Sequence, residues 1–502
     1  MSGASDRETI KKILREGGRY LGAALAGLLT YPIVARVLDG EGLGVWALLG
    51  AAAFLLNLAD LGLTTSVQRS AVTADHARTR RLVRLALLVL CVTLPVIAVI
   101  AYFLLLDLPG ADPALRADAA RAAVVALAAG AVMAVGAPLR GFTLARGGVR
   151  LLANAKLLAS VVQVVGILGG FVFFRTLLVP AFALLFAYLA ELAVTIWAAR
   201  QYDPEIPLRP GLARDRRELV SAFRDGGAQL VINLAVTTAL RVDLFVLVRV
   251  APLAIVAAYG VAGRAIDQAY LLAKQATAAI LPDLGKPEHR ARAVRVGTGL
   301  FATVIVSGML AVAIVGQPVL VAWVGEVAAG ELPAIVLGLL AVGAIVMSLY
   351  EIAGTMVMLS ARTGWACALP ILAGSALNLT LSISGAPIYG VWAVAGSTIV
   401  GNAVTLGLMW RNARKILGWS VPRLFGGVAP AFAAAAGAGV SGALMAPWAH
   451  GGFVASLTSC VVVTALGVLA GSAAMRLAGI SVRGTTPRTP PSSAVSPQEA
   501  AE

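Results

Sequence analysis

The segment LVRLALLVLCVTLPVIAVIAYFLLL, residues 82–106, carries a single charged residue, Arg84, close to its start. The hydrocarbon core of a bilayer is about 30 Å thick, and a helix needs roughly 20 apolar residues to cross it. This segment is longer than that minimum, so it predicts a transmembrane helix.

Comparable apolar runs recur along the whole chain. The chain is 59% hydrophobic and 13% charged, whereas a soluble domain is about 25% charged. The sequence therefore predicts an all-α membrane protein with about fourteen transmembrane helices. The other runs are 17–37, 43–66, 119–139, 151–174, 177–199, 225–248, 252–274, 296–321, 332–359, 363–383, 387–410, 424–446 and 452–475.

The distribution of positive charge predicts the topology. The net charge is +15, which in a soluble protein would suggest a nucleic-acid partner. If the N-terminus is placed inside and the helices alternate, most of the 40 Lys and Arg residues fall in cytoplasmic segments, as the positive-inside rule requires. We therefore predict that both termini are cytoplasmic, and we expect no nucleic-acid partner.

The longest polar connection divides the chain into two similar halves. Residues 201–223 are rich in Arg and Pro and follow the sixth helix. Arg15–Gly18 and Arg224–Gly227 both read Arg-acid-Gly-Gly at the start of a half. Six helices per half place both copies in the same orientation, which predicts a pseudo-twofold axis along the membrane normal. The expected units are a lobe at 1–200, the linker 201–223, a lobe at 224–415, two further helices within 416–479 and a disordered tail at 480–502.

One stretch near the N-terminus carries a family resemblance. VARVLDGEGLGVWALLGAAAFLLNLADLGL, residues 34–63, has Arg36, Leu38, a Gly/acidic turn, Gly44, Trp46 and a final Asp-Leu-Gly-Leu. This pattern, together with the stretch at 385–404, resembles the bacterial polysaccharide transporters. They belong to the same superfamily as lipid II flippases and multidrug-and-toxin extrusion transporters.

The resemblance implies a function that the residues alone do not. It implies a MATE-like fold in a bacterial cytoplasmic membrane and the export of lipid-diphosphate-linked oligosaccharide repeat units by alternating access. The implied partners are this substrate, membrane lipids, and the polymerase and glycosyltransferases of polysaccharide synthesis. A monomer is the expected state.

Polar side chains within two adjacent membrane runs indicate where a substrate would bind. Ionisable groups inside a membrane are costly and usually face a cavity or a partner, and arginine offers forked donors for phosphate oxygens. We therefore predict a cationic lumen that binds the diphosphate. Alternatively, Arg264 and Asp267 only neutralise each other, and Lys274 reaches the cytoplasmic surface. The predicted substrate-binding residues are Arg19, Gln229, Asn233, Arg241, Arg264, Gln268 and Lys274.

Acidic residues in the membrane runs are candidates for ion coupling: Asp60, Glu191, Asp267 and Glu351. The structural alternative for Asp60 is an ion pair with Arg69, Arg78 or Arg81. For Glu191 and Glu351, the alternative is a hydrogen bond between helices.

Two other transport functions and one enzyme class compete with this interpretation. A lipid II flippase would share the cationic lumen, whereas a cation- or proton-coupled multidrug exporter would have a buried acidic pocket. The sequence has no Asp-x-Asp or His-x4-Asp motif and no aqueous segment large enough for a nucleotide donor. We therefore expect no enzymatic activity, no cofactor and no metal.

Overall fold

The computed structural model describes residues 29–72, 75–106, 108–211, 216–267, 299, 303–360, 364–417 and 429–477. Every regular element in these ranges is helical. Within these described ranges, ten helices are long and apolar enough to cross a membrane, or eleven if one bent pair counts as a span. The chain is therefore an all-helical, multi-span membrane protein, as predicted.

Ten predicted apolar runs correspond to membrane-length helices in the structure. The first of these helices joins α3 to a short 3₁₀ segment, η1 (Leu56–Asp60). The helices are α3 (Gly40–Leu55) with η1, α5 (His76–Leu106), α6 (Pro113–Ala145), α7 (Val149–Phe173), α8 (Leu178–Tyr202), α14 (Glu331–Ser360), α15 (Trp365–Tyr389), α16 (Val391–Leu417), α18 (Ala429–Ala449) and α19 (Phe453–Leu477).

Three of the remaining runs differ from simple straight helices or extend beyond the described residues. Run 17–37 is described only as α2 (Thr30–Val37), and run 252–274 only as helical residues 253–267. Run 225–248 becomes α9 (Arg216–Thr237), the π-helical turn η2 (Thr238–Val242) and α10 (Asp243–Val250). The predicted linker 201–223 is accordingly shorter in the structure, because α8 ends at Tyr202 and α9 begins at Arg216.

The membrane helix predicted at 43–66 ends at Asp60 in the structure, because the chain turns at Leu61 and Gly62. Both have positive φ angles, 48° and 80°, and α4 (Leu63–Val72) begins after them. The Asp60 carboxylate accepts hydrogen bonds from the backbone N–H groups of Gly62 (2.9 Å) and Thr64 (3.3 Å). Asp60 thus caps α4, and the expected pairing with Arg69, Arg78 or Arg81 is absent from the described part of the chain.

The predicted run 296–321 is also interrupted. Two helical segments, Thr303–Val315 and Gln317–Ala328, form an angle of 73°. The second segment consists of α13 (Gln317–Val324) and η3 (Gly325–Ala328). The break lies at Gly316, and Pro318 follows it within the first turn of α13. Proline lacks a backbone N–H, so it is tolerated at the first turn of a helix but interrupts a helix interior.

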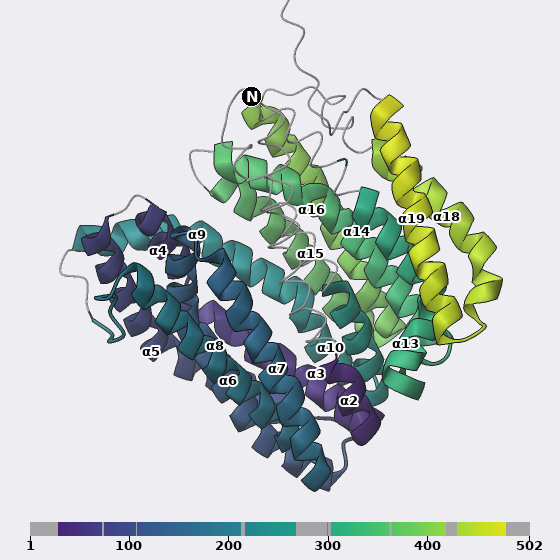
Figure 1. The fold of residues 1–502 in the computed structure, drawn as a ribbon, viewed down its shortest axis with the longest axis horizontal. Coiled ribbons are helices and arrows are strands. Elements are labelled where there is room, and N and C mark those ends of the chain that lie inside the picture. Colours follow the sequence, from purple (N-terminus) through teal and green to yellow (C-terminus); the bar gives the residue numbers. More distant parts are fainter. Residues whose placement is uncertain are drawn as a thin grey trace, which may run out of the picture.

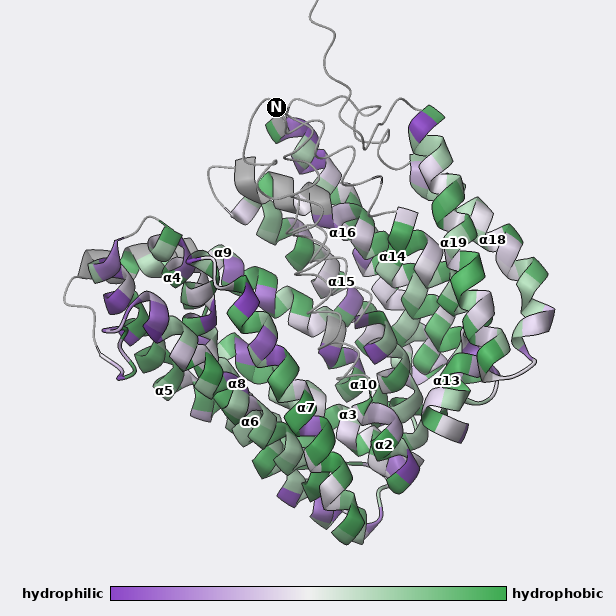
Figure 2. Ribbon diagram, viewed as in Figure 1, coloured by the Kyte–Doolittle hydropathy of each residue, from purple (hydrophilic) through white to green (hydrophobic). Residues whose placement is uncertain are grey.

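The helices form two arms that meet at one end and diverge toward the other (Figure 1). The first lobe comprises α2 to α8, and the second lobe comprises α9 to α16. Helices α18 and α19 lie along the outer side of the second lobe, where Gly467 and Gly471 approach Ser307 and Thr303. Figure 2 shows hydrophobic residues over the outer flanks of both arms and hydrophilic residues on α9 and near α10, between them.

Backbone-level contacts join the lobes at the end predicted to face away from the cytoplasm. A Cβ on Gly44 of α3 would lie 2.3 Å from the Leu253 carbonyl oxygen, and one on Gly260 would lie 2.7 Å from the Ala47 Cβ. Only glycine permits such close approach. The first and second lobes are therefore closely packed against each other at this end.

The opposite end has a second contact between the lobes, where α9 begins. Ser66 Oγ of α4 donates a hydrogen bond to the Ala222 carbonyl of α9 (2.9 Å). A Cβ on Gly62 would lie 2.2 Å from the Gly226 carbonyl oxygen. The Asp-Leu-Gly-Leu turn of the first lobe thus packs on the Arg-Asp-Gly-Gly segment of the second.

Substituting Gly62 should destabilise the protein more than substituting another glycine with the same backbone conformation. Gly62→Ala should cost about 1–2 kcal/mol for the left-handed backbone and a further 1–3 kcal/mol or so for the clash with Gly226. Gly110 is the matched control, since its φ is 74° and a Cβ there meets nothing within 4 Å. Thermal unfolding in detergent measures both variants. Equal midpoints would mean that the contact between α4 and α9 contributes nothing.

The linker is fixed to the first lobe by an ion-pair cluster. Arg80 of α5 donates to both Asp203 carboxylate oxygens, from Nε at 2.7 Å and Nη2 at 2.6 Å, and it also pairs with Glu205. The Gly211 N–H donates to the Arg84 carbonyl at 3.1 Å. The hydrogen bonds from Arg80 hold the pKa of Asp203 below its usual value, as expected for a carboxylate beside a guanidinium.

The lowered pKa of Asp203 predicts a specific pH dependence. The pKa of an aspartate in the unfolded protein is about 3.9. A carboxyl group whose pKa is lower than this in the folded protein stabilises the fold at pH values above the unfolded-state pKa. That stabilisation is lost as the pH falls through the folded pKa. Asp203→Asn should therefore lower the thermal midpoint at pH 7, and the difference from wild type should shrink toward pH 3. The exposed cap Asp112→Asn serves as control; a pH-independent difference for Asp203→Asn would contradict the ion-pair account.

Candidate functional site

Two predicted arginines and one predicted aspartate form a single cluster in the middle of the molecule. Arg241 Nη2 lies 2.6 Å from Asp267 Oδ2, and Arg264 Nη1 lies 4.0 Å from the same oxygen. The first distance is that of a charge-assisted hydrogen bond, and the second is a longer ion pair. Among these three side chains, one carboxylate faces two guanidinium groups, so their summed charge is +1.

The cluster lies against the first lobe. Arg264 Nε donates to the Tyr31 hydroxyl of α2 at 3.0 Å, and Arg241 lies over the Phe54 ring of α3 at 4.9 Å. The Arg264 side chain is 31% exposed, compared with 10% for Arg241. Arg264 is thus held at the boundary between the lobes, and its side chain is only partly buried. No sequence pattern predicts that Tyr31 or Phe54 contacts these arginines.

Two of the predicted substrate-binding residues, Gln229 and Asn233, lie one turn apart on α9, before the π-helical turn η2. Gln229 Nε2 donates to Asn233 Oδ1 at 2.9 Å, and Thr237, one turn further on, is buried. Arg241 follows within η2, where a π-helical turn replaces the α-helical i→i+4 spacing. Such turns often occur at functional sites. Because of it, the position of Arg241 around the helix axis differs from that of a straight α-helix.

Three of the predicted substrate-binding residues, Arg19, Gln268 and Lys274, lie outside the residues that the structure describes. Their placement relative to the cluster remains a prediction from the sequence.

Glu191 is not the isolated acid that the sequence suggested. Its carboxylate on α8 lies 3.5 Å from Arg140 Nη1 of α6 and 3.4 Å from Lys156 Nζ of α7. Lys156 also lies over the Tyr188 ring at 5.5 Å. Two cations again share one carboxylate, here within the first lobe.

The structure reveals a buried acid that sequence reasoning missed, Asp243 in the first turn of α10. Asp243 is 2% exposed. Three hydroxyls donate to its carboxylate: Tyr259 at 2.8 Å, Thr398 at 3.1 Å and Ser382 at 3.3 Å. These donors come from residues 253–267, α16 and α15, so the site assembles only when the second lobe folds. In the described part of the chain, Asp243 forms no ion pair with a basic residue.

Asn378 adds a further oxygen close to this site. It lies one helical turn before Ser382 on α15, and residues four apart share a helix face. Its side-chain Oδ1 is buried and has no hydrogen-bond partner in the described residues. Buried polar atoms normally have a partner, so this oxygen is a candidate acceptor or ligand on the same face of α15 as Ser382, which contacts Asp243. Applying the rule for intramembrane acids to Asp243, as to Glu191, would have found this site.

The other two candidate acids occupy different environments. Asp60 caps α4 and is 5% exposed, whereas Glu351 is half-buried on α14.

Comparison with known proteins identifies the fold. No protein-family model matches the sequence, and a search of curated proteins gives no match. Among solved structures, the lipid II flippase MurJ in an inward closed conformation aligns with a TM-score of 0.71 at 10% identity, over 92% of this chain and 99% of the flippase. A mutant of the Vibrio cholerae MATE transporter VcmN aligns with a TM-score of 0.61 at 16% identity, over 84% of this chain and 100% of the transporter.

A third structure extends the comparison. An inward-facing multidrug resistance MATE family transporter of the MOP superfamily has a TM-score of 0.61 at 15% identity, over 80% of this chain and 94% of that transporter. These structural neighbours are transporters and a flippase. The chain therefore has the fold of the MOP superfamily, shared by the MATE transporters and the lipid II flippase.

Proposed function

We propose that this protein is a flippase that moves lipid-diphosphate-linked oligosaccharide repeat units across a bacterial cytoplasmic membrane by alternating access. Both termini would lie in the cytoplasm. The observation that carries the proposal is the Arg241–Arg264–Asp267 cluster. It contains two guanidinium groups and one carboxylate, and Arg264 contacts Tyr31 of the first lobe.

The chemistry of the cluster suits a diphosphate. Phosphates cannot cross hydrocarbon without compensation of their charge, and arginine remains charged in any protein environment. A phosphate oxygen can accept from the part of the Arg264 guanidinium that Asp267 does not engage. Because Arg264 also contacts Tyr31 of the first lobe, substrate binding there would compete with or reinforce the contact between lobes. Binding is thereby coupled to the relative position of the lobes.

The Asp243 site would couple this movement to a cation gradient. It offers a carboxylate, three hydroxyls and an amide oxygen, which is the oxygen-only ligand set preferred by hard cations. Its ligands come from four helical segments of the second lobe: α10, residues 253–267, α15 and α16. Binding of sodium, or of a proton to the carboxylate, would change how these segments pack.

The test uses the full-length protein in proteoliposomes with a fluorescent polyprenyl-diphosphate-linked oligosaccharide. Accessibility of the label to a membrane-impermeant quencher measures movement between leaflets. We expect protein-dependent translocation of this substrate and none of a phosphatidylcholine analogue. If the protein moves a cationic dye but no diphosphate-linked lipid, the multidrug-exporter function replaces this proposal.

A lipid II flippase is the second candidate, and one observation favours it. The aligned region covers 92% of this chain for MurJ but 84% and 80% for the two MATE transporters. Lipid II also carries a polyprenyl diphosphate, so the cationic cluster fits both substrates. Competition between labelled oligosaccharide substrate and unlabelled lipid II distinguishes them. If unlabelled lipid II competes at a half-maximal concentration about tenfold or more below that of the unlabelled oligosaccharide substrate, lipid II is the substrate. A tenfold difference corresponds to about 1.4 kcal/mol.

A further inference from the structure

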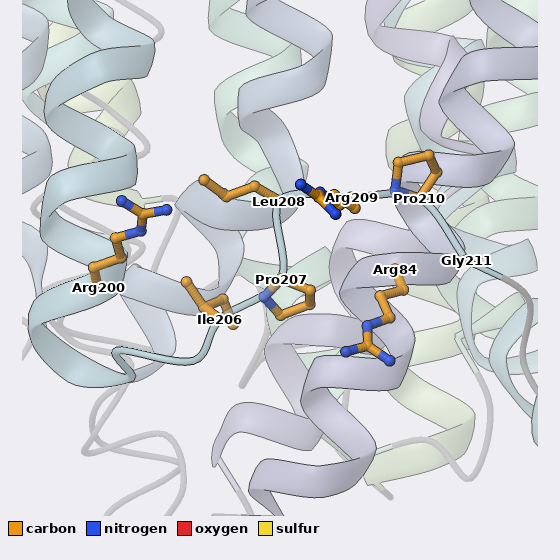
Figure 3. Close-up of a pocket in the computed structure, with 8 residues that line it drawn as sticks. All are labelled: Arg84, Arg200, Ile206, Pro207, Leu208, Arg209, Pro210 and Gly211. Atoms are coloured by element: carbon orange, nitrogen blue, oxygen red, sulfur yellow. The ribbon is translucent and has the colours of Figure 1, made fainter.

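A cavity separate from the Arg241–Arg264–Asp267 cluster lies where the linker passes between α5 and α8 (Figure 3). Its volume is about 440 Å³. Arg84 comes from α5, Arg200 from the last turn of α8 and Arg209 from the linker itself. In Figure 3, Arg84 and Arg200 lie on opposite sides of the linker backbone. The remaining lining residues are Ile206, Pro207, Leu208, Pro210 and Gly211. We call this cavity the linker pocket.

The linker pocket has uncompensated positive charge. The two nearby linker acids, Asp203 and Glu205, are both engaged by Arg80. None of Arg84, Arg200 and Arg209 forms an ion pair with an acid in the described part of the chain. Three guanidinium groups thus surround a cavity large enough for a small ligand, and each can donate two parallel hydrogen bonds to an oxyanion.

The position of the linker pocket indicates the source of the anion. Arg84 lies near the start of α5 and Arg200 near the end of α8, where both helices reach the side that the charge distribution assigns to the cytoplasm. Leu208 in the lining is 38% exposed, and Trp197, one turn before Arg200, is 54% exposed. Exposed aromatic and apolar side chains beside arginines are typical of a membrane interface. Basic pockets on the cytoplasmic side of helix bundles bind anionic lipid headgroups.

We propose that the linker pocket binds the phosphate-bearing headgroup of an anionic phospholipid from the cytoplasmic leaflet. The headgroup phosphate accepts from the arginines, and the acyl chains lie along the exposed apolar surface of α8. This lipid is a resident ligand and is distinct from the transported substrate. The proposal does not depend on the proposed transport function.

Lipid binding at this position has a structural consequence. The linker is the only covalent connection between α8 of the first lobe and α9 of the second. Its backbone is held to α5 by the Gly211–Arg84 hydrogen bond and the Arg80 ion pairs. A headgroup that bridges Arg84, Arg200 and Arg209 adds a third attachment. Anionic lipid therefore keeps the linker on the first lobe and sets where α9 begins.

The test compares two triple variants of the full-length protein that lose the same charge. In Arg84→Gln/Arg200→Gln/Arg209→Gln, the linker pocket is neutralised. In Arg411→Gln/Arg414→Gln/Lys415→Gln, three exposed cations at the end of α16, on the same predicted side, are neutralised. Each protein is purified from vesicles of equimolar phosphatidylglycerol and phosphatidylcholine, and retained lipid is counted by native mass spectrometry. Thermal midpoints are measured with added phosphatidylglycerol and, separately, with inorganic phosphate in neutral detergent.

We expect wild type and the α16 variant to retain phosphatidylglycerol over phosphatidylcholine, and the linker-pocket variant to retain about tenfold less. Equal retention by both triple variants would overturn the site. Stabilisation of wild type by inorganic phosphate without any preference for phosphatidylglycerol would overturn the lipid source. If the triple variant does not fold, Arg209→Gln alone replaces it, because Arg209 is exposed on the linker and forms no ion pair with a described acid. The phosphatidylglycerol retained by Arg209→Gln protein is then compared with that retained by Arg414→Gln protein.

Discussion

Replacing Arg264 by glutamate should reduce translocation of a diphosphate-linked oligosaccharide by about a hundredfold or more. The substitution changes the cluster from one positive charge in excess to one negative charge in excess, since Arg241 and Asp267 remain. Unit charges about 4 Å apart interact by about 4 kcal/mol at an effective dielectric constant near 20, and about 1.4 kcal/mol is tenfold in affinity. Initial rates of leaflet exchange in proteoliposomes measure the effect.

Two control variants separate the charge of Arg264 from its position. Arg264→Lys keeps the charge but loses the forked donor that binds phosphate oxygens, so an intermediate loss is expected. Tyr31→Phe removes only the hydroxyl that accepts from Arg264 Nε, so its effect should be smaller than that of Arg264→Glu. Size-exclusion profiles confirm that each variant is folded. If folded Arg264→Glu protein translocates the substrate at the wild-type rate, the cluster is structural and the proposed function loses its main support.

Replacing Asp243 by asparagine should abolish the dependence of transport on a cation gradient. Asparagine has nearly the same shape as aspartate and can still accept from Tyr259, but it carries no charge and cannot titrate. We expect wild-type rates to rise with an imposed sodium or proton gradient and the variant's rates to be independent of it. If the coupling ion is sodium, saturating sodium should also stabilise wild type by about 2.7 kcal/mol at 100 times its dissociation constant, but not the variant.

Asp39→Asn is the control for this experiment. Asp39 is an exposed carboxylate that caps α3 by accepting from the Gly42 N–H at 2.7 Å, and asparagine caps helices equally well. It should therefore retain the response to the gradient. Sodium- and proton-driven experiments in parallel identify the ion. Undiminished gradient dependence in folded Asp243→Asn protein would move the search for the coupling site to Glu191 and Glu351.

The membrane helices were predictable because the length of an apolar run is a local property of the sequence. The interruptions at Gly62 and Gly316 were not. A glycine in an apolar run is compatible with a continuous helix, and only packing decides otherwise. At Gly62 the deciding contact is with Gly226, which is far away in sequence. The cap that Asp60 provides to α4 depends on that turn, so the role of Asp60 was equally hidden.

The candidate site was predictable only for its charged members. Arg241, Arg264 and Asp267 stand out because charge is rare inside membrane runs, and the structure brings them together. Asp243 was visible by the same rule but lies between Arg241 and Arg249, near the end of an apolar run. Its partners Ser382 and Thr398 are neutral hydroxyls, which are common in membrane helices and give no signal of their own. Their convergence is a property of the folded lobe.

The close contact between Gly44 and Leu253 at one end of the two arms gives the molecule the mechanics of a lever. Helix α6 has 33 residues and is therefore about 50 Å long. A rotation of about 10° around this fulcrum would displace the far end of such a helix by about 9 Å, which is close to the diameter of a whole helix. Such a movement would have to separate the contact between Gly62 and Gly226 at that end. A side chain larger than glycine at position 44 would force the fulcrum apart. Its effect would therefore be greatest at the opposite surface of the membrane.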